Sequence, residues 1–484
     1  MSRTTVADVI VDGLRRAGTP RLFAVEGTPA DIPLLEAARA LALPITLAAS
    51  SAGACVMAAV TGDLIDAPGA AVLSESAAVS APASALTRAM ADGAPMILLT
   101  SGQPSTVAGC KETLGVEAGT AAHRIAHAAR LSMTTPRGPV HLDLAADVAE
   151  RAAVPLATSC RPDALPYPDA DALDRAAHAL ADASRPLLLA GLHCRSDDAA
   201  QWLRALAEAL PAPLLATARA KGALPDPHPL MLGVLGVAGV EERLLGRADL
   251  VVAIGLDALE PVPAACWSTR PVLAFGPAQA PSDRTPAVQV AGDVGVIIEE
   301  LAVRLRDKPR ADWDVAELDR LRREATARGT GDGLAARVVR LAREATPAGT
   351  IATVDTSAHH ACVAAAWHAI APREFLTSSA LEASGFALPA AIAAHLAHPR
   401  RRVVCFTDTA GLTAAARELE LAARLAAPVV IVVFDDAAPD VADLMRMAAS
   451  FGVSVSAVES EPIFARALSG ALGIAGPSLI AARP

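Results

Sequence analysis

The chain has 484 residues, which suggests about three domains at roughly 150 residues each. Hydrophobic residues make up 53% of it and aromatic residues 3%, so it has ample apolar surface for several cores, and an intrinsically disordered chain is excluded. The net charge of −10 argues against a nucleic-acid partner, which would need clustered Lys and Arg.

Two further features define the expected environment of the protein. The first residues do not combine a basic segment with an apolar core, and no charge-free apolar run reaches about 18 residues. We therefore expect a cytoplasmic protein with no membrane partner. The seven cysteines are scattered without a Cys-x-x-Cys pair, which predicts buried thiols rather than a zinc or redox site.

Short Val, Ile and Leu runs alternate with Ala-rich helical segments in the first part of the chain. Continuous apolar runs bounded by Gly, Pro, Ser or Asp are typical of strands buried on both faces, and their alternation with helices indicates a parallel α/β sheet. The expected strands cover residues 20–25, 69–74, 95–100 and 138–144. The Pro-rich segment that follows, residues 151–170, lacks periodicity and is predicted to be a surface linker.

Two more α/β units follow this linker. The expected strands of the second unit cover residues 186–192, 212–218, 248–255 and 271–276. A highly charged stretch, residues 299–328, is predicted to be a solvated linker helix. The expected strands of the third unit cover residues 350–355, 401–406 and 427–436. The predicted fold class is α/β with three doubly wound parallel-sheet domains. The first and third domains show the same succession of helix, strand, glycine turn, helix and strand.

Motifs spread along the chain carry a family resemblance. In the third unit they are Gly385-Phe386-x-Leu388-Pro389-Ala390-Ala391, Glu418-Leu419 and Pro428. In the first two units they are Phe23-x-x-x-Gly27-Thr28, Asp92-x-x-Pro95, Gly138-Pro139, Arg185-Pro186, Lys221-Gly222 and Ala248-Asp249. In this order they resemble the thiamine-diphosphate enzymes of the acetolactate synthase, pyruvate oxidase and benzoylformate decarboxylase group. The resemblance implies a pyrimidine-binding-like domain at 1–150, a central domain at 165–305 and a pyrophosphate-binding-like domain at 335–484.

The resemblance also implies a function. The chain would be an acetolactate-synthase-like enzyme that uses thiamine diphosphate and Mg²⁺ to cleave or form a carbon–carbon bond of a small 2-oxo acid. It would form a homodimer or homotetramer, with sites between the first domain of one chain and the third of another. The alternative is a homologue that has lost both cofactors and uses its cleft for cofactor-free chemistry or for binding a ligand or partner. Gly191 and Gly255 follow strands without a G-x-G-x-x-G fingerprint, so no flavin is expected.

The candidate catalytic positions depart from the family pattern. Ser51 stands where the family has its catalytic Glu, and a hydroxyl can hydrogen-bond a ring nitrogen but cannot store a proton as a carboxylate does. Three other carboxylates, Glu26, Glu75 and Glu382, stand at loop positions that face the family's cleft. They either take over the acid–base work or are solvated loop residues. His359 aligns with a His-containing loop of the family and is either a proton relay or a surface side chain.

The candidate cofactor positions are altered as well. The family's metal-binding Asp aligns with Thr409 and its Asn with Asp436, while a shift by one residue places Asp408 at the Asp position. Asp408, Thr409 and Asp436 therefore form a candidate metal site, and the alternative is an acidic cluster in solvent. The candidate cofactor-binding residues are Thr28, Ser384, Gly385, Asp408, Thr409 and Ala410, with Ser384 in place of a bulky apolar residue.

Overall fold

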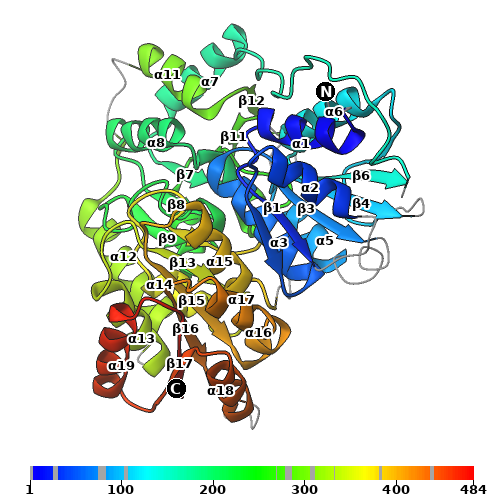
Figure 1. Ribbon diagram of the computed structural model, residues 1–484. Coiled ribbons are helices and arrows are strands. Elements are labelled where there is room, and N and C mark those ends of the chain that lie inside the picture. Colours follow the sequence, from blue (N-terminus) through cyan, green and yellow to red (C-terminus); the bar gives the residue numbers. More distant parts are fainter. Residues whose placement is uncertain are drawn as a thin grey trace.

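The computed structural model describes residues 4–25, 31–74, 83–102, 107–145, 147–268, 270–277, 286–305, 311–331, 333–380, 384–435 and 441–483. These residues form three six-stranded sheets in which the paired strands run parallel, with helices packed against the sheets (Figure 1). The predicted α/β class with three sheets is confirmed. None of the helices in these ranges has the length and apolar character needed to cross a membrane.

The first sheet is buried on both faces, as its apolar strands predict. In β3 (Gly69–Ser74), Ala71 and Leu73 face one core while Ala70 and Val72 face the other. The strand order is β2 (Ile45–Ala48), β1 (Leu22–Val25), β3, β4 (Met96–Gly102), β6 (Pro139–Ala145) and β5 (Thr113–Val116). The helices are α1 (Val6–Arg16), α2 (Ile32–Ala40), α3 (Ser51–Ile65), α5 (Ala83–Ala91) and α6 (Ala121–Met133).

The central sheet has the doubly wound order of dinucleotide-binding folds. Its strands are β12 (Val288–Ala291), β11 (Val272–Gly276), β10 (Leu250–Ile254), β7 (Pro186–Ala190), β8 (Leu214–Ala216) and β9 (Met231–Val234). The helices are α7 (Ala170–Asp182), α8 (Asp197–Ala209), α9 (Glu241–Arg247), α10 (Ala265–Ser268) and α11 (Val294–Arg304), with short 3₁₀ turns at Leu192–Cys194 and Ala218–Ala220. The preceding linker, residues 151–170, is mostly exposed, as predicted.

The third sheet repeats the strand order of the first. The order is β14 (Phe375–Leu376), β13 (Ile351–Val354), β15 (Val403–Asp408), β16 (Val429–Phe434), β18 (Ser478–Ala482) and β17 (Ser454–Val458). If the six strands of each sheet are numbered along the chain, their order across both sheets is second, first, third, fourth, sixth and fifth. The helices are α13 (Leu334–Glu344), α14 (His360–Ala366), α15 (Ala387–Ala397), α16 (Thr409–Ala414), α17 (Glu418–Arg424), α18 (Val441–Ser450) and α19 (Glu461–Gly473).

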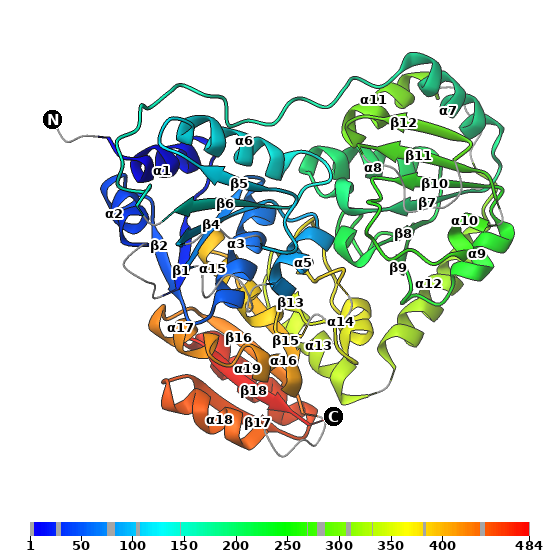
Figure 2. The same cartoon turned by 90° about the vertical axis from the view of Figure 1, so that its right-hand side faces the viewer.

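The connection between the second and third sheets differs from the predicted solvated helix. The stretch 299–328 is divided between the end of α11 and α12 (Val315–Thr330), which runs from the central to the third domain (Figure 2). Leu318, Leu321 and Ala325 of α12 are buried against the central domain. Their spacing of three and four residues forms an apolar stripe, which the high charge density of the segment obscured.

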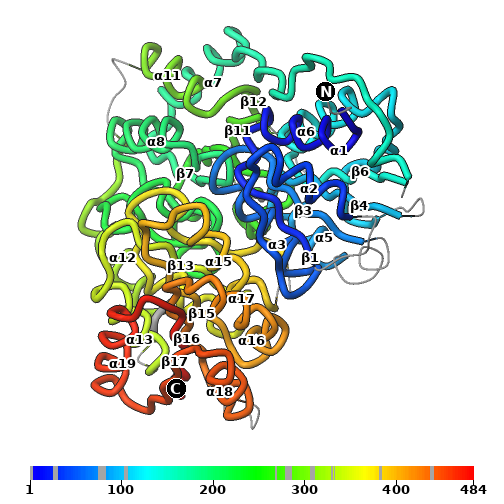
Figure 3. The backbone as a smooth tube through the Cα atoms, in the orientation of Figure 1, coloured from blue at the N-terminus to red at the C-terminus, as the bar shows by residue number. Residues whose placement is uncertain are grey.

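The first and third domains share one core, so the chain closes back on itself after the central domain (Figure 3). Helix α3 packs against α15, and both are buried along nearly their whole length. Their Ala-rich surfaces allow close approach. At Gly69, beside α3, an added Cβ would lie only 1.8 Å from the carbonyl oxygen of Ala58.

Candidate functional site

The third sheet has a topological switch point between β13 and β15. From β13 the chain continues to β14 on one side, whereas β15 is followed by β16 on the other side. Ligands of open α/β sheets bind outside the carboxyl ends of the strands at such a point. Because Val354 pairs with Phe406, the residues that follow, Asp355 and Thr407, lie next to each other there.

The Asp355 side chain organises the switch point. It is 2% exposed, and its Oδ1 accepts hydrogen bonds from the backbone N–H groups of Phe386 (2.7 Å) and Ala387 (3.0 Å). Its Oδ2 accepts a hydrogen bond from the Thr407 hydroxyl at 2.6 Å. Burial raises the pKa of Asp355, although these hydrogen bonds oppose the shift. The carboxylate therefore positions the start of α15 beside β15.

Two buried hydroxyl groups at the switch point lack a hydrogen-bond partner. They are the Oγ1 atoms of Thr356, the second residue after β13, and of Thr409, the first residue after β15, and neither has a partner among the described residues. A buried polar group left unpaired costs about 1–3 kcal/mol. A bound ligand with acceptor oxygens would satisfy both hydroxyls. The predicted cofactor residue Thr409 thus lies at the point where the topology predicts a ligand.

The acidic residues of the candidate metal site have other roles in the structure. Asp408 caps α16, because its Oδ1 accepts the backbone N–H of Gly411 at 2.7 Å. Asp435, next to the predicted Asp436, is 4% exposed and pairs with Arg483 at 3.0 Å. Asp436 lies outside the described residues. Within the described ranges no group of three or more His, Cys, Asp or Glu could hold a metal ion, so the metal site stays a prediction.

Ser51 is the buried first residue of α3, and the structure places a carboxylate close to it. The Ser50 hydroxyl donates to Glu418 Oε1 at 2.7 Å and accepts the backbone N–H of Gly53 at 2.9 Å. Glu418 begins α17 in the third domain and is 1% exposed, and this burial raises its pKa. In the sequence, Glu418 stands out only as part of the Glu418-Leu419 family motif. Because Glu420 is a second carboxylate in the same helical turn, no local pattern distinguished Glu418.

The remaining predicted residues are distributed around this region. Ser384 is exposed, and its carbonyl oxygen accepts a hydrogen bond from Arg88 at 3.2 Å. Gly385 has a φ of +79°, and an added Cβ would lie 2.9 Å from the Cβ of Ala414, so this position favours glycine. Ala410 lies in the first turn of α16 and is exposed. Glu26, Thr28, Glu75 and Glu382 lie outside the described residues.

A cavity of about 430 Å³ lies between the central and third domains; we call it the His360 cavity. Its polar lining includes Thr356, His360, Ser378, Ser379, Arg219 and Glu260. His360 Nε2 lies 3.0 Å from the Thr377 hydroxyl, and burial lowers the pKa of this imidazole, so it is neutral at pH 7. The predicted His359 instead stacks on Phe434, with ring centroids 4.5 Å apart. Spacing alone could not distinguish these neighbours, because the start of α14 determines which one faces the cavity.

Three family models match the chain in order. They are the N-terminal TPP binding domain of thiamine pyrophosphate enzymes over residues 4–125, the central domain over 173–301 and the C-terminal TPP binding domain over 355–441. Each model matches part of one of the three sheets and its helices, and together they match well over half of the chain.

Individual relatives agree with these models. The chain is 26% identical over 449 residues to the acetolactate synthase isozyme 1 large subunit of Escherichia coli, covering 82% of this chain and 79% of the relative. It is 25% identical over 527 residues to the catabolic acetolactate synthase of Raoultella terrigena, covering 98% of this chain and 94% of the relative. The same fold occurs in an X-ray structure of a protein from Mycobacterium smegmatis that is described as a thiamin diphosphate-dependent enzyme. The TM-score is 0.81 at 22% identity, and the match covers 100% of this chain and 99% of that protein.

The described residues fit the diphosphate of this cofactor better than its metal. The unpaired hydroxyls of Thr356 and Thr409 are suitable donors to phosphate oxygens. For Mg²⁺, Asp408 is half-buried but already caps a helix, and the Asp435 carboxylate is neutralised by Arg483. Ser51, the residue predicted to face the cofactor's pyrimidine ring, has a hydroxyl where the family pattern has a carboxylate.

Proposed function

Because the chain belongs to the thiamine-diphosphate-dependent enzyme superfamily, we propose that it binds thiamine diphosphate at the switch point between β13 and β15. The pair of unpaired buried hydroxyls on Thr356 and Thr409 is the observation that carries this proposal. These hydroxyls would donate to the diphosphate. When bound, the cofactor would supply a nucleophilic carbon for addition to a carbonyl group. We propose a small 2-oxo acid as the substrate and cleavage or formation of the bond beside its carbonyl as the reaction.

The His360 cavity is the proposed place for the substrate. Arg219 lines it, is 6% exposed, and uses its terminal nitrogens for Asp63 and two backbone carbonyl oxygens. Its buried Nε has no partner among the described residues, so this N–H would donate to the carboxylate of a 2-oxo acid. The neutral imidazole of His360 would hydrogen-bond the carbonyl side of the substrate. Val234, Val237 and other apolar wall residues would exclude water from this position.

The proposal includes a homodimer or homotetramer. In this proposal, which rests on the family resemblance, the complete site would lie between the first domain of one chain and the third domain of another, so a lone chain would lack part of its pyrimidine-binding surface. Light scattering coupled to gel filtration measures this directly. A monomeric protein that binds the cofactor fully would refute this part of the proposal.

Calorimetric titration of the full-length protein with thiamine diphosphate, with and without Mg²⁺, tests the cofactor proposal. We expect saturable binding by the wild type. The affinity of Thr409→Val for thiamine diphosphate should be lower by about tenfold or more, because a hydrogen bond to a charged group is lost. The matched control is Thr413→Val in the same helix, whose exposed hydroxyl already donates to the Thr409 carbonyl oxygen at 2.7 Å.

Two results would overturn the cofactor proposal. One is the absence of binding at millimolar thiamine diphosphate, which would favour the alternative of a homologue with a reused cleft. The other is equal affinity of the Thr409→Val and Thr413→Val variants, which would place the diphosphate elsewhere.

A further inference from the structure

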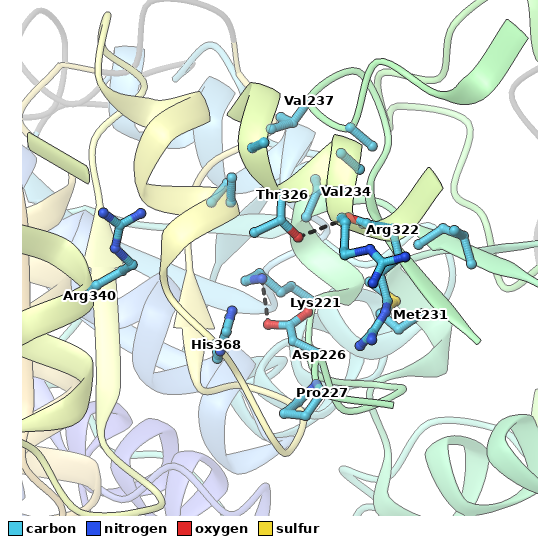
Figure 4. A pocket seen from close by; sticks show the side chains of 18 of the residues that line it. Lys221, Asp226, Pro227, Met231, Val234, Val237, Arg322, Thr326, Arg340 and His368 are labelled. Atoms are coloured by element: carbon cyan, nitrogen blue, oxygen red, sulfur yellow. Dashed lines mark hydrogen bonds and ion pairs between the residues drawn. The ribbon is translucent and has the colours of Figure 1, made fainter. Parts of the chain in front are cut away.

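A second cavity, of about 690 Å³, lies where the central domain, helix α12 and the third domain meet. We call it the Arg340 cavity. Its walls come from β9 and the following loop, from α12, and from α13 and α14. Figure 4 shows Lys221, Asp226 and His368 close together near its middle, with Arg322 on one side and Arg340 on the other.

The charged side chains around the Arg340 cavity leave a positive surplus in a protein with a net charge of −10. The cavity is lined by Lys221, Arg322, Arg323 and Arg340, against a single acidic residue, Asp226. Lys221 pairs with Asp226 at 2.5 Å, and the Asp226 carboxylate also accepts the backbone N–H of Ala369 at 2.7 Å. This acidic group is therefore already paired with one cation of the same lining.

The three arginines are incompletely neutralised. Arg322 and Arg323 share one carboxylate, Asp319, each at 3.0 Å. The buried Nε of Arg322 has no hydrogen-bond partner among the described residues. Arg340 is half-buried and makes no hydrogen bond or ion pair with any residue in the described ranges. Four cations thus face two carboxylates, which leaves a surplus of two positive charges.

Apart from Thr326 and His368, the rest of the lining is apolar and suits an organic body. Met231, Val234, Val237, Ala364 and Ala365 are among the wall residues. A volume of about 690 Å³ is within the range of cavities that hold drug-sized ligands, which are mostly apolar with a few placed polar groups. Guanidinium groups are preferred partners of phosphate because they present several donors in one plane.

We propose that the Arg340 cavity is a second ligand site, which binds a phosphate monoester carried on an apolar body. A phosphate monoester has a charge close to −2 at neutral pH, which matches the surplus of the lining. This site does not depend on thiamine diphosphate. Val234 and Val237 line both this cavity and the His360 cavity, so a ligand here would contact a wall of the proposed substrate position.

Fluorescence titration of the full-length protein with 1-naphthyl phosphate tests this proposal. Two half-probes are titrated separately: 1-naphthol represents the apolar body of the ligand, and inorganic phosphate represents its phosphate group. We expect one saturable site for 1-naphthyl phosphate and at least about tenfold weaker binding of either half-probe. Arg340→Gln should weaken the binding of 1-naphthyl phosphate by about tenfold or more, because its guanidinium has no competing partner. Arg337→Gln is the matched control, since this neighbour on α13 lies outside the lining and pairs with Glu461 at 3.3 Å.

A second variant tests the apolar wall without changing the charge. Ala365→Leu adds a larger side chain to the wall and should lower the affinity for 1-naphthyl phosphate by about tenfold. The affinity for inorganic phosphate should be unchanged. Four results would overturn the proposal: no saturable binding, equal affinity for 1-naphthol, equal affinity for inorganic phosphate, or equal losses in Arg340→Gln and Arg337→Gln.

Discussion

Asp63 is the centre of a buried charge cluster that joins the first domain to the central domain. It lies near the end of α3, is 6% exposed, and binds Arg195 through both carboxylate oxygens, at 2.5 and 2.9 Å. Arg219 approaches the same carboxylate at 3.4 Å and also donates to carbonyl oxygens of the first and third domains. We predict that Asp63→Asn strongly destabilises the protein.

The expected magnitude follows from the partners that remain. Removing the charge leaves the Arg195 guanidinium, 7% exposed, without its carboxylate partner. Arg219, 6% exposed, loses one carboxylate but keeps the attraction of Asp92 and Glu260. Breaking a buried ion pair from one side costs about 3–5 kcal/mol, and because Asn can still accept one hydrogen bond we expect about 3 kcal/mol. With an unfolding entropy of about 2 cal/mol/K per residue over 484 residues, that corresponds to a fall in Tm of about 3 °C.

The matched control is Asp66→Asn, at the end of the same helix. Its carboxylate is 54% exposed and pairs with Arg137 at 2.5 Å, and exposed pairs contribute about 0–1 kcal/mol. Thermal unfolding followed by circular dichroism compares the two variants. Equal Tm values for Asp63→Asn and Asp66→Asn would refute the reasoning.

The pH dependence gives an independent test of the same cluster. Burial by itself would raise the pKa of Asp63, but Arg195 and Arg219 outweigh it and hold the pKa well below its usual range. A depressed carboxyl pKa adds stability above the pKa of the unfolded chain, near 4, and this stability is lost as the pH falls. The difference between the wild type and Asp63→Asn should be complete at pH 7 and shrink below about pH 4. A difference that stays constant down to pH 3 would contradict this account.

Two further predictions concern the buried contacts between domains. Burial raises the pKa of Glu418, so its ionised form is unfavourable in the folded protein. Glu418→Gln should therefore gain stability relative to the wild type as the pH rises from the carboxyl pKa of the unfolded chain, about 4, to the raised pKa of the folded protein. A difference in Tm between the two proteins that stays constant from about pH 4 upwards would contradict this expectation. At Gly222, with a φ of +89°, an added Cβ would lie 2.1 Å from the Ala371 carbonyl oxygen, so Gly222→Ala should cost more than about 2 kcal/mol in urea unfolding. By contrast, Gly246→Ala, in α9 with open space around the position, should stabilise by about 0.5–1 kcal/mol, and equal effects at the two glycines would refute both expectations.

The elements of this fold were predictable because their signals are local. The run Val429–Phe434 is apolar at every position, and the strand it predicts is β16, buried between helices on both faces. Asp355 follows such a run, and its place at the carboxyl end of β13 follows from the strand alone. The helix α12 was the partial failure, since its apolar stripe of Leu318, Leu321 and Ala325 is sparse among charged residues. Periodicity in a short window was therefore sufficient to predict strands and helices only where apolar residues dominate the segment.

The candidate site depended on contacts that no local pattern contains. Ser50 meets Glu418 across 368 residues, and Asp63 meets Arg195 across 132. The choice between His359 and His360 was decided by where α14 begins, and the unpaired hydroxyls could be recognised only once burial was known. By itself the sequence determined three parallel α/β sheets, because burial of alternating apolar segments is encoded residue by residue. Which polar groups meet was decided only by the tertiary structure, because domain packing brings distant residues together and removes water from them.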